Sequence, residues 1–329
     1  MKTVLFLDSV CPRPYDNRVF SEGNCGGTEL TVVMIAEALG KTGLLDVFVE
    51  QHNRTDVYDS EYVTYSNRGW VQNADYVIVL RSPLEMLEAR KRFPHAKIWN
   101  WAHDLATREL GLSLPIYKET EAQHICVSNF HKTQTLGVFQ PMGYTGEFKI
   151  SVLYNPIPDD LQPDDTPVDY TKLVFFSSKH KGLDYTLELF QRLRSFNPEF
   201  HLEIANPGYL PDASVNLENV YVLGSLGHNE VIKRVRRALC VFYPNTVFPE
   251  TFGRIFSESN AVGTPVLTHP LGAAREVLYH PSETLDCRNP RSVIDRVMAW
   301  HSGNRPKVKA NPKFRLSTII ESWKRLFNA

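Results

Sequence analysis

The sequence lacks several features that define specialised classes of protein. Its five cysteines are odd in number and include no CxxC pair, which disfavours a disulfide framework or a zinc site. No stretch offers the roughly 18 apolar residues of a spanning helix, and Asp8 ends the first apolar run too early for a signal peptide. The formal net charge of −1 gives no general attraction to nucleic acid. We therefore expect a cytoplasmic globular protein with reduced thiols and no nucleic-acid partner.

Several catalytic motifs are missing as well. The chain contains no P-loop, no GxGxxG, no HExxH and no GxSxG. NTPase, simple dehydrogenase, zincin and esterase chemistry therefore lack their usual residues.

Short β-branched runs alternate with helical patterns along most of the chain, which predicts parallel sheets covered on both faces. With 329 residues, the chain exceeds one ordinary hydrophobic core, so we expect two doubly wound α/β domains. The stretch 155–170, rich in proline and aspartate, is the predicted linker. In the tail, one helical face is apolar and should pack on a domain; it carries Ile319, Ile320, Trp323, Leu326 and Phe327.

Two glutamates follow the predicted strand 240–244. Glu250 comes after a short loop, Thr251 is the predicted helix cap, and Glu258 is expected about two turns into the helix. The amide groups at such a helix start favour a phosphate, and carboxylates suit sugar or ribose hydroxyls. A nucleotide sugar carries both groups. On spacing alone, however, such a pair is common on solvated helices.

The flanking residues strengthen the interpretation, because the segment PETFGRIFSESNAVGTPVL resembles the donor-site signature of the family 4 retaining glycosyltransferases, which have the GT-B fold. The matching residues are Glu250, Phe252, Gly253, Glu258, Gly263, Pro265 and Val266. Downstream, GAAREV is similar to the family's next loop through Gly272 and Glu276.

The resemblance implies roles for these residues. Glu258 would hold the ribose hydroxyls, Glu250 would contact the donor sugar, and the backbone at Phe252 and Gly253 would approach the sugar phosphate. Arg254 either adds a phosphate contact or pairs with a neighbouring acid; the sequence leaves both open.

Upstream, FFSSKHKGLDYTLELF resembles the family's first donor-domain strand, whose loop ends in Lys-Gly. Lys181 and Gly182 match, so Lys181 would stabilise the departing diphosphate. Many family members carry an arginine after this strand, where this chain has Ser177 and Ser178, with Lys179 nearby. Ser178 is included among the donor-binding candidates.

In the first domain, NCGGTEL resembles the family's Gly-Gly-x-Glu loop. Gly26 and Gly27 would approach a phosphate or the acceptor, with Thr28 as a helix cap and Glu29 in the first turn.

His103 follows a predicted strand and is a candidate for contacting sugar or acceptor, although a structural role is equally compatible with the sequence. Ser128 and Asn155 are weaker candidates. Basic clusters at 231–239 and 88–97 leave peripheral membrane contact open, with solvated helix faces as the alternative.

Taken together, the resemblance implies two Rossmann-like domains facing a central cleft, as in GT-B proteins. Residues 1–158 would bind the acceptor, residues 168–311 the donor, and a C-terminal helix within 312–329 would return to the first domain. The implied reaction moves a sugar from a nucleotide sugar to a hydroxyl acceptor, such as a glycan or a lipid-linked group, with retention of configuration.

No cofactor is expected beyond the nucleotide-sugar substrate, and no metal, since the chain has no Asp-x-Asp triplet. Two alternatives stay open: a catalytically weak protein that binds nucleotide sugars or glycans, and another GT-B enzyme such as an epimerase. The sequence makes no prediction of the nucleobase, the sugar, the linkage or the oligomeric state.

Overall fold

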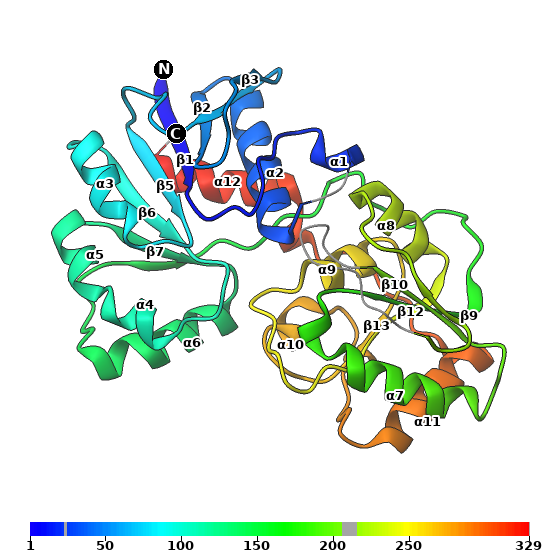
Figure 1. Ribbon diagram of the computed structural model, residues 1–329. Helices are drawn as coiled ribbons and strands as arrows, with labels where there is room; N and C mark the ends of the chain where they lie inside the picture. The colour runs from blue at the N-terminus through cyan, green and yellow to red at the C-terminus, as the bar shows by residue number, and fades with distance from the viewer. Residues whose placement is uncertain (23–24, 206–215, 329) are drawn as a thin grey trace. The chain divides into compact units, whose positions relative to one another are not determined.

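The computed structural model describes residues 1–22, 25–205 and 216–328, which form two compact units (Figure 1). The first unit contains Met1–Asn17, Gly27–Pro156 and Leu316–Ala329. The second contains Arg18–Gly26 and Ile157–Arg315. The chain thus passes from the first unit to the second after Pro156 and returns after Arg315.

An eight-stranded sheet forms the centre of the first unit. All neighbouring strands are parallel except β3 and β4. In spatial order they are β3 (Tyr58–Asp59), β4 (Val63–Asn67), β2 (Leu45–Gln51), β1 (Lys2–Asp8), β5 (Tyr76–Leu80), β6 (Lys97–Trp101), β7 (Gln123–Cys126) and β8 (Ile150–Val152). Every residue of β5 is buried, so both faces of the sheet are covered there, as expected for a doubly wound fold.

The helices of the first unit follow the strands. They are α2 (Gly27–Lys41), α3 (Glu85–Arg92), α4 (Arg108–Leu112), α5 (Leu114–Thr120), α6 (Asn129–Phe139), the short η1 (Gln140–Met142) and α12 (Leu316–Phe327). The start of α6 has a clear local cause, because the Ser128 hydroxyl accepts a hydrogen bond from the His131 amide at 2.9 Å. Ser128, a weak site candidate, is therefore a helix cap.

The C-terminal helix α12 packs within the first unit, beside α2 (Figure 1). Its apolar face is buried at Ile319, Ile320, Trp323 and Phe327. The Trp323 ring lies 5.8 Å from that of Phe6 in β1 and 4.8 Å from that of Trp101 in β6, measured between ring centroids. The helical face predicted from sequence is therefore the one that meets the first sheet.

The second unit contains a five-stranded parallel sheet. Its spatial order is β11 (Val220–Val222), β10 (His201–Ala205), β9 (Asp169–Phe176), β12 (Ala238–Tyr243) and β13 (Val266–Thr268). Strand β9 begins at Asp169 because that residue pairs with Ala238 of β12, so the last two residues of the predicted linker 155–170 are strand.

The helices of the second unit are mostly short. They are α1 (Val19–Glu22), η2 (Lys179–Lys181), α7 (Leu183–Arg194), α8 (His228–Arg236), α9 (Arg254–Ala261), α10 (Ala274–Val277), η3 (Pro281–Glu283), α11 (Pro290–Ala299), η4 (Trp300–Asn304) and η5 (Pro312–Phe314). Ahead of the return to the first unit, the incoming and outgoing segments pair, since the Ile157 amide donates to the Phe314 carbonyl at 2.8 Å.

The arginines of the two basic clusters are largely committed to internal contacts. Arg90 donates to the carbonyl oxygens of Thr120, Pro94 and Ala96, and Arg92 pairs with buried Glu50 at 2.8 Å.

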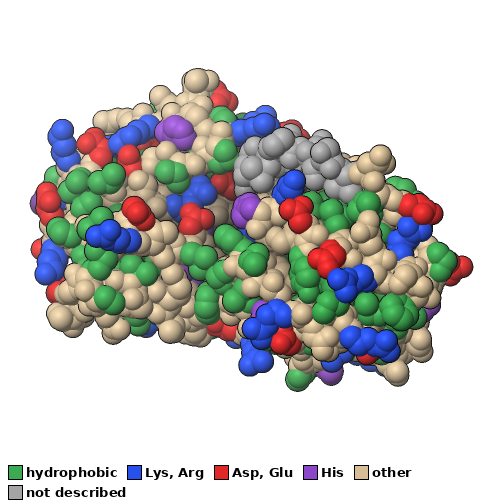
Figure 2. All heavy atoms as spheres, turned by 60° about the horizontal axis from the view of Figure 1, so that its bottom comes forward, with side chains coloured by type: hydrophobic (Ala, Val, Ile, Leu, Met, Phe, Trp, Pro, Cys, Tyr) green, Lys and Arg blue, Asp and Glu red, His purple; other side chains and the backbone are tan. Residues whose placement is uncertain are grey.

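In the second unit, Arg234 pairs with Glu203 and Glu230, and Arg236 pairs with Asp164. Basic and acidic side chains are interspersed on the face drawn in Figure 2. Over the ranges that the structure describes, each helix is too short or too polar to span a bilayer.

Replacing Trp323 by alanine should destabilise the first unit by about 3–5 kcal/mol, because it empties a large buried site between α12 and the sheet. Denaturant unfolding followed by tryptophan fluorescence measures this change. Glu321→Ala, on the exposed face of the same helix, is the matched control and should change stability by less than about 0.5 kcal/mol. Equal effects of the two substitutions would contradict the packing role of Trp323.

Candidate functional site

The loop after β12 carries Glu250 and is shaped by one buried side chain. The Asn245 Oδ1 accepts hydrogen bonds from the amides of Val247 and Phe248, both at 3.0 Å, and its Nδ2 donates to the Phe248 carbonyl. Asn245 is 2% exposed and also packs against Gly182, which has φ +93°. This contact joins the loops that follow β9 and β12 at the carboxyl edge of the sheet, where parallel sheets bind ligands.

Glu250 and Lys181 form an ion pair across these two loops. The Lys181 Nζ lies 2.8 Å from the Glu250 Oε1 and 3.0 Å from its Oε2. The Tyr243 hydroxyl donates to the same Oε1 at 2.7 Å. Burial and the nearby Glu250 charge raise the pKa of Tyr243, so it remains a hydrogen-bond donor. The structure thus brings together two residues that the sequence singled out, 69 positions apart.

A third loop supports Glu250 from its backbone side. The Ala273 amide donates to the Glu250 carbonyl at 2.9 Å. Gly272 has φ +65°, and a Cβ on it would lie 2.5 Å from the Glu250 carbonyl oxygen. Only glycine fits this close approach, which gives the GAAREV segment a structural reason.

Helix α9 begins later than predicted. Its first residue is Arg254 and its N-cap is Gly253, with φ +81°. The prediction that Thr251 caps the helix is therefore wrong, and Glu258 lies one turn into the helix instead of two. The physical reason is that Phe252 is buried against the Phe314 ring, with centroids 5.1 Å apart, before the chain turns into the helix.

Glu258 is a buried carboxylate held by two nitrogen-bearing side chains. Arg254, one turn earlier, pairs with its Oε1, and the His228 Nε2 lies 3.1 Å from the same oxygen. Burial opposes ionisation, but Arg254 and His228 outweigh it and lower the pKa of Glu258 to about 2. Of the two possibilities left open for Arg254, the structure contains the pairing with a neighbouring acid.

His228 was not identified from the sequence. It is the first residue of α8, and it follows β11 at the carboxyl edge of the sheet, which is the positional signal that could have found it. Its ring also contacts the Phe20 ring edge-on, with centroids 6.5 Å apart.

The other donor-side candidates surround these two ion pairs. Ser178 is buried and precedes η2, where the Lys181 amide donates to its carbonyl at 3.0 Å. Thr251 is partly exposed, between Glu250 and the buried Phe252 side chain.

In the first unit, helix α2 begins at Gly27, so Thr28 lies inside the first turn and is not a cap. Gly26 is buried and precedes the helix, and Asn24 of the same segment lies outside the described residues. His103 follows β6 and is buried, with its ring 4.5 Å from that of Trp101.

A buried charge cluster at the carboxyl edge of the first sheet was also missed. The Arg81 Nη2 lies 3.1 Å from the Glu29 Oε1 and 3.5 Å from the Asp8 Oδ1. Burial opposes the Arg81 charge, but Asp8, Glu29 and Asp104 outweigh it and raise the pKa of its guanidinium. Arg81 has φ +59°, a strained conformation for a side chain of this size, and such strain is often found at functional sites.

The cysteines show no sign of catalytic activation. All five are thiols and not disulfides, and burial raises the pKa of the Cys11, Cys126 and Cys287 thiols to about 12. Within the part of the chain that the structure describes, no three His, Cys, Asp or Glu side chains are grouped to hold a metal ion.

Part of the chain matches a known protein family. Residues 169–311, which form most of the second unit, match the family model described as glycosyl transferases group 1. A sucrose-phosphate synthase from Thermosynechococcus elongatus is similar in structure with a TM-score of 0.65 at 12% identity, covering 100% of this chain and 98% of that one.

Two further solved structures are similar over nearly their whole length. An α,α-trehalose-phosphate synthase from Burkholderia xenovorans has a TM-score of 0.66 at 9% identity, with 99% of both chains covered. WaaG, a glycosyltransferase involved in lipopolysaccharide biosynthesis, has a TM-score of 0.64 at 14% identity, with 99% of this chain and 100% of that chain covered.

The chain has the GT-B fold. At these identities the structural likeness shows the fold alone, and among the curated proteins none matches this sequence. The family model and the GT-B fold together support glycosyltransferase activity, and the match falls on the unit that carries Lys181, Glu250 and Glu258.

Replacing Arg254 by methionine should destabilise the second unit by about 3–5 kcal/mol at neutral pH, because it removes the main counter-charge of buried Glu258. The ion pair lowers the folded-state pKa of Glu258, so its stabilising effect is full above the unfolded pKa. It is lost as the pH falls from about 4.5 toward 2. Unfolding measured between pH 7 and pH 3 should therefore show a smaller acid-induced loss in the variant.

The double variant Arg254→Met/Glu258→Gln is the control for this prediction, because it removes the buried charge together with its partner. It should recover much of the lost stability. If the double variant is as unstable as the sum of the two single variants, the pairing does not stabilise the unit.

Proposed function

We propose that this protein is a metal-independent, retaining glycosyltransferase that uses a nucleotide-sugar donor and a hydroxyl acceptor. The observation that carries the proposal is the pair of neighbouring carboxylate–cation contacts, Lys181–Glu250 and Arg254–Glu258, at the carboxyl edge of the second sheet. The family-model match over the same unit supports it.

The electrostatics of α9 favour an anion beside it. The N-terminus of a helix carries a partial positive charge, which attracts anions. Arg254 is the first residue of α9 and adds a full positive charge at the same end. A diphosphate beside Arg254 and Lys181 would interact favourably with both cations and with the helix. We assign the diphosphate to this place.

Donor binding would then exchange partners in both ion pairs. As the diphosphate attracts Lys181 and Arg254, the carboxylates of Glu250 and Glu258 become available to sugar and ribose hydroxyls. The contacts of Glu258 with His228 and Arg254 both use its Oε1. His228 would keep the carboxylate oriented during the exchange.

In the proposed reaction, Lys181 stabilises the negative charge that develops on the departing diphosphate. Glu250 orients the sugar, and the acceptor hydroxyl attacks from the face that the diphosphate leaves, which retains the anomeric configuration. The first unit would bind the acceptor. His103 would contact sugar or acceptor, and the backbone at Gly26 and Gly27 would approach a donor phosphate or the acceptor. Donor and acceptor alignment then supplies much of the rate increase.

One nucleoside diphosphate from a panel of UDP, GDP, ADP, CDP and dTDP should raise the melting temperature in a concentration-dependent way, because it binds only the native state. The matching nucleoside should have a much smaller effect, since it lacks the diphosphate.

Lys181→Met should weaken the diphosphate effect, and Glu250→Gln should reduce sugar transfer about 100-fold or more. Transfer should be unchanged by EDTA, and NMR of the product should show retention.

Glu188→Gln is the control for these variants, because Glu188 is an exposed residue of α7 whose ion pair among the described residues is with Arg192 on the same helix. It should leave binding and transfer unchanged. Tight nucleotide binding with equally negligible turnover in wild type and Glu250→Gln would indicate a binding protein. Turnover of the donor without transfer to any acceptor would indicate another GT-B enzyme, such as an epimerase.

A further inference from the structure

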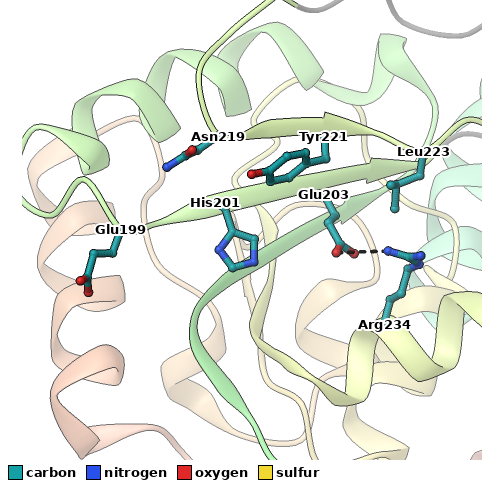
Figure 3. Close-up of a pocket in the computed structure, with 7 residues that line it drawn as sticks. All are labelled: Glu199, His201, Glu203, Asn219, Tyr221, Leu223 and Arg234. Carbon is teal, nitrogen blue, oxygen red and sulfur yellow. Dashed lines mark ion pairs between the residues drawn. The ribbon is translucent and has the colours of Figure 1, made fainter.

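A groove of about 460 Å³ runs along one face of β10 and β11 in the second unit (Figure 3). Alternate residues of the two strands line it, as the two-residue period of a strand requires. From β10 these are His201 and Glu203, and from β11 Tyr221, with Asn219 just before that strand. Arg234 of α8 closes one side, and Figure 3 shows its ion pair with Glu203.

The polarity of this face is unusual for its position. Strand β10 lies between β11 and β9, so it is an inner strand of a parallel sheet, where both faces are normally apolar. On the opposite face, Leu202 and Ile204 follow this rule and are 0% and 2% exposed. On the groove face, the strand instead presents an imidazole and a carboxylate.

Only one of the two carboxylate oxygens of Glu203 has partners among the described residues. Its Oε1 contacts the Lys172 Nζ at 2.9 Å and the Arg234 Nη1 at 3.2 Å. Its Oε2 is buried and has no hydrogen-bond partner among the described residues. Leaving such an oxygen unpaired is unfavourable, and a ligand hydroxyl donated at the base of the groove would satisfy it.

Tyr221 supplies an open aromatic surface beside this carboxylate. It is the cross-strand neighbour of Glu203 and is 51% exposed. The His201 ring lies against it edge-on, with centroids 6.2 Å apart. The Asn219 amide nitrogen donates to the Pro198 carbonyl at 3.0 Å, which holds that side chain in place and leaves its oxygen as an acceptor.

The charges around the groove nearly cancel. The cations Lys172 and Arg234 are offset by the carboxylates of Glu203 and Glu199, and His201 lies 3.6 Å from Asp169. A strongly anionic or cationic ligand would therefore gain little here. An open aromatic face among mixed donors and acceptors instead suits a neutral ligand with many hydroxyl groups.

We propose that this groove binds a neutral oligosaccharide, with one sugar ring packed on Tyr221 and its hydroxyls directed at Glu203 and Asn219. The groove uses none of the residues that hold Glu250 or Glu258. It is a separate site on the donor unit, and it goes beyond the proposed transfer activity.

Binding is tested on the full-length protein without donor, by calorimetry with maltopentaose, cellopentaose, chitopentaose and mannopentaose. At least one of these should bind the wild type. Tyr221→Ala should weaken that binding about tenfold or more, because it removes the packing surface. Tyr279→Ala should not, since Tyr279 is a comparably exposed tyrosine (42%) of the same unit that lies outside the groove.

Hydrogen–deuterium exchange locates the site: the bound oligosaccharide should slow exchange in peptides covering 199–205 and 219–223. Failure of all four oligosaccharides to bind, or equal affinity of Tyr221→Ala and wild type, would overturn the proposal. Tighter binding of oligogalacturonate would overturn the neutral-ligand assignment. Because Glu250→Gln should bind the oligosaccharide as wild type does, the outcome is separate from that of the proposed transfer reaction.

Discussion

The buried carboxylate of Glu258 is the constraint on which the arrangement at the carboxyl edge of the second sheet depends. Removing a carboxylate from water costs several kcal/mol unless cations and hydrogen bonds compensate. Here Arg254 and His228 compensate, and they come from two helices, α9 and α8, whose starts must therefore meet. Gly253 makes this possible, because its left-handed conformation ends the loop and lets α9 begin at Arg254.

Glu250 follows the same logic one loop away, with Lys181 and Tyr243 as its partners. Each carboxylate in the ligand-free protein therefore already has a counter-charge, and the edge carries little net charge of its own. Free phosphate would draw the cations away from Glu250 and Glu258 without offering these carboxylates hydroxyl groups in return, whereas a nucleotide sugar brings its own hydroxyl groups. Under the proposed function, this pairing selects for ligands that carry both features.

Much of the fold follows from local patterns. The alternation of β-branched runs with helical patterns predicts both sheets, which are parallel except at β3–β4, and α6 begins where Ser128 supplies a local cap. Strands β3, β4 and β8 were not predicted; β3 and β8 have only two and three residues, which are too few for a period to show. The start of α9 was misplaced because Phe252 packs on Phe314, a contact 62 positions distant that no local pattern encodes.

The candidate site divides in the same way. Glu250, Glu258 and Lys181 could be identified because their neighbours in sequence form a recognisable motif, and the family model covers that region at 169–311. The partners Tyr243, His228 and Asn245 could not, since each carries an ordinary local context and acquires its role only when strands end at one edge.

The charge cluster of the first unit is harder to predict from the sequence than the site in the second unit. Its buried cluster joins Asp8, Glu29 and Arg81, which lie at the end of β1, in α2 and after β5. Each strand end is separated from the next by a whole crossover, so no motif spans the cluster. The parallel pairing of β1 and β5 brings Asp8 and Arg81 together, and Arg81 has a positive φ where its guanidinium pairs with both acids. A backbone strained in this way persists when surrounding contacts compensate for it, and the two buried carboxylates supply that compensation here.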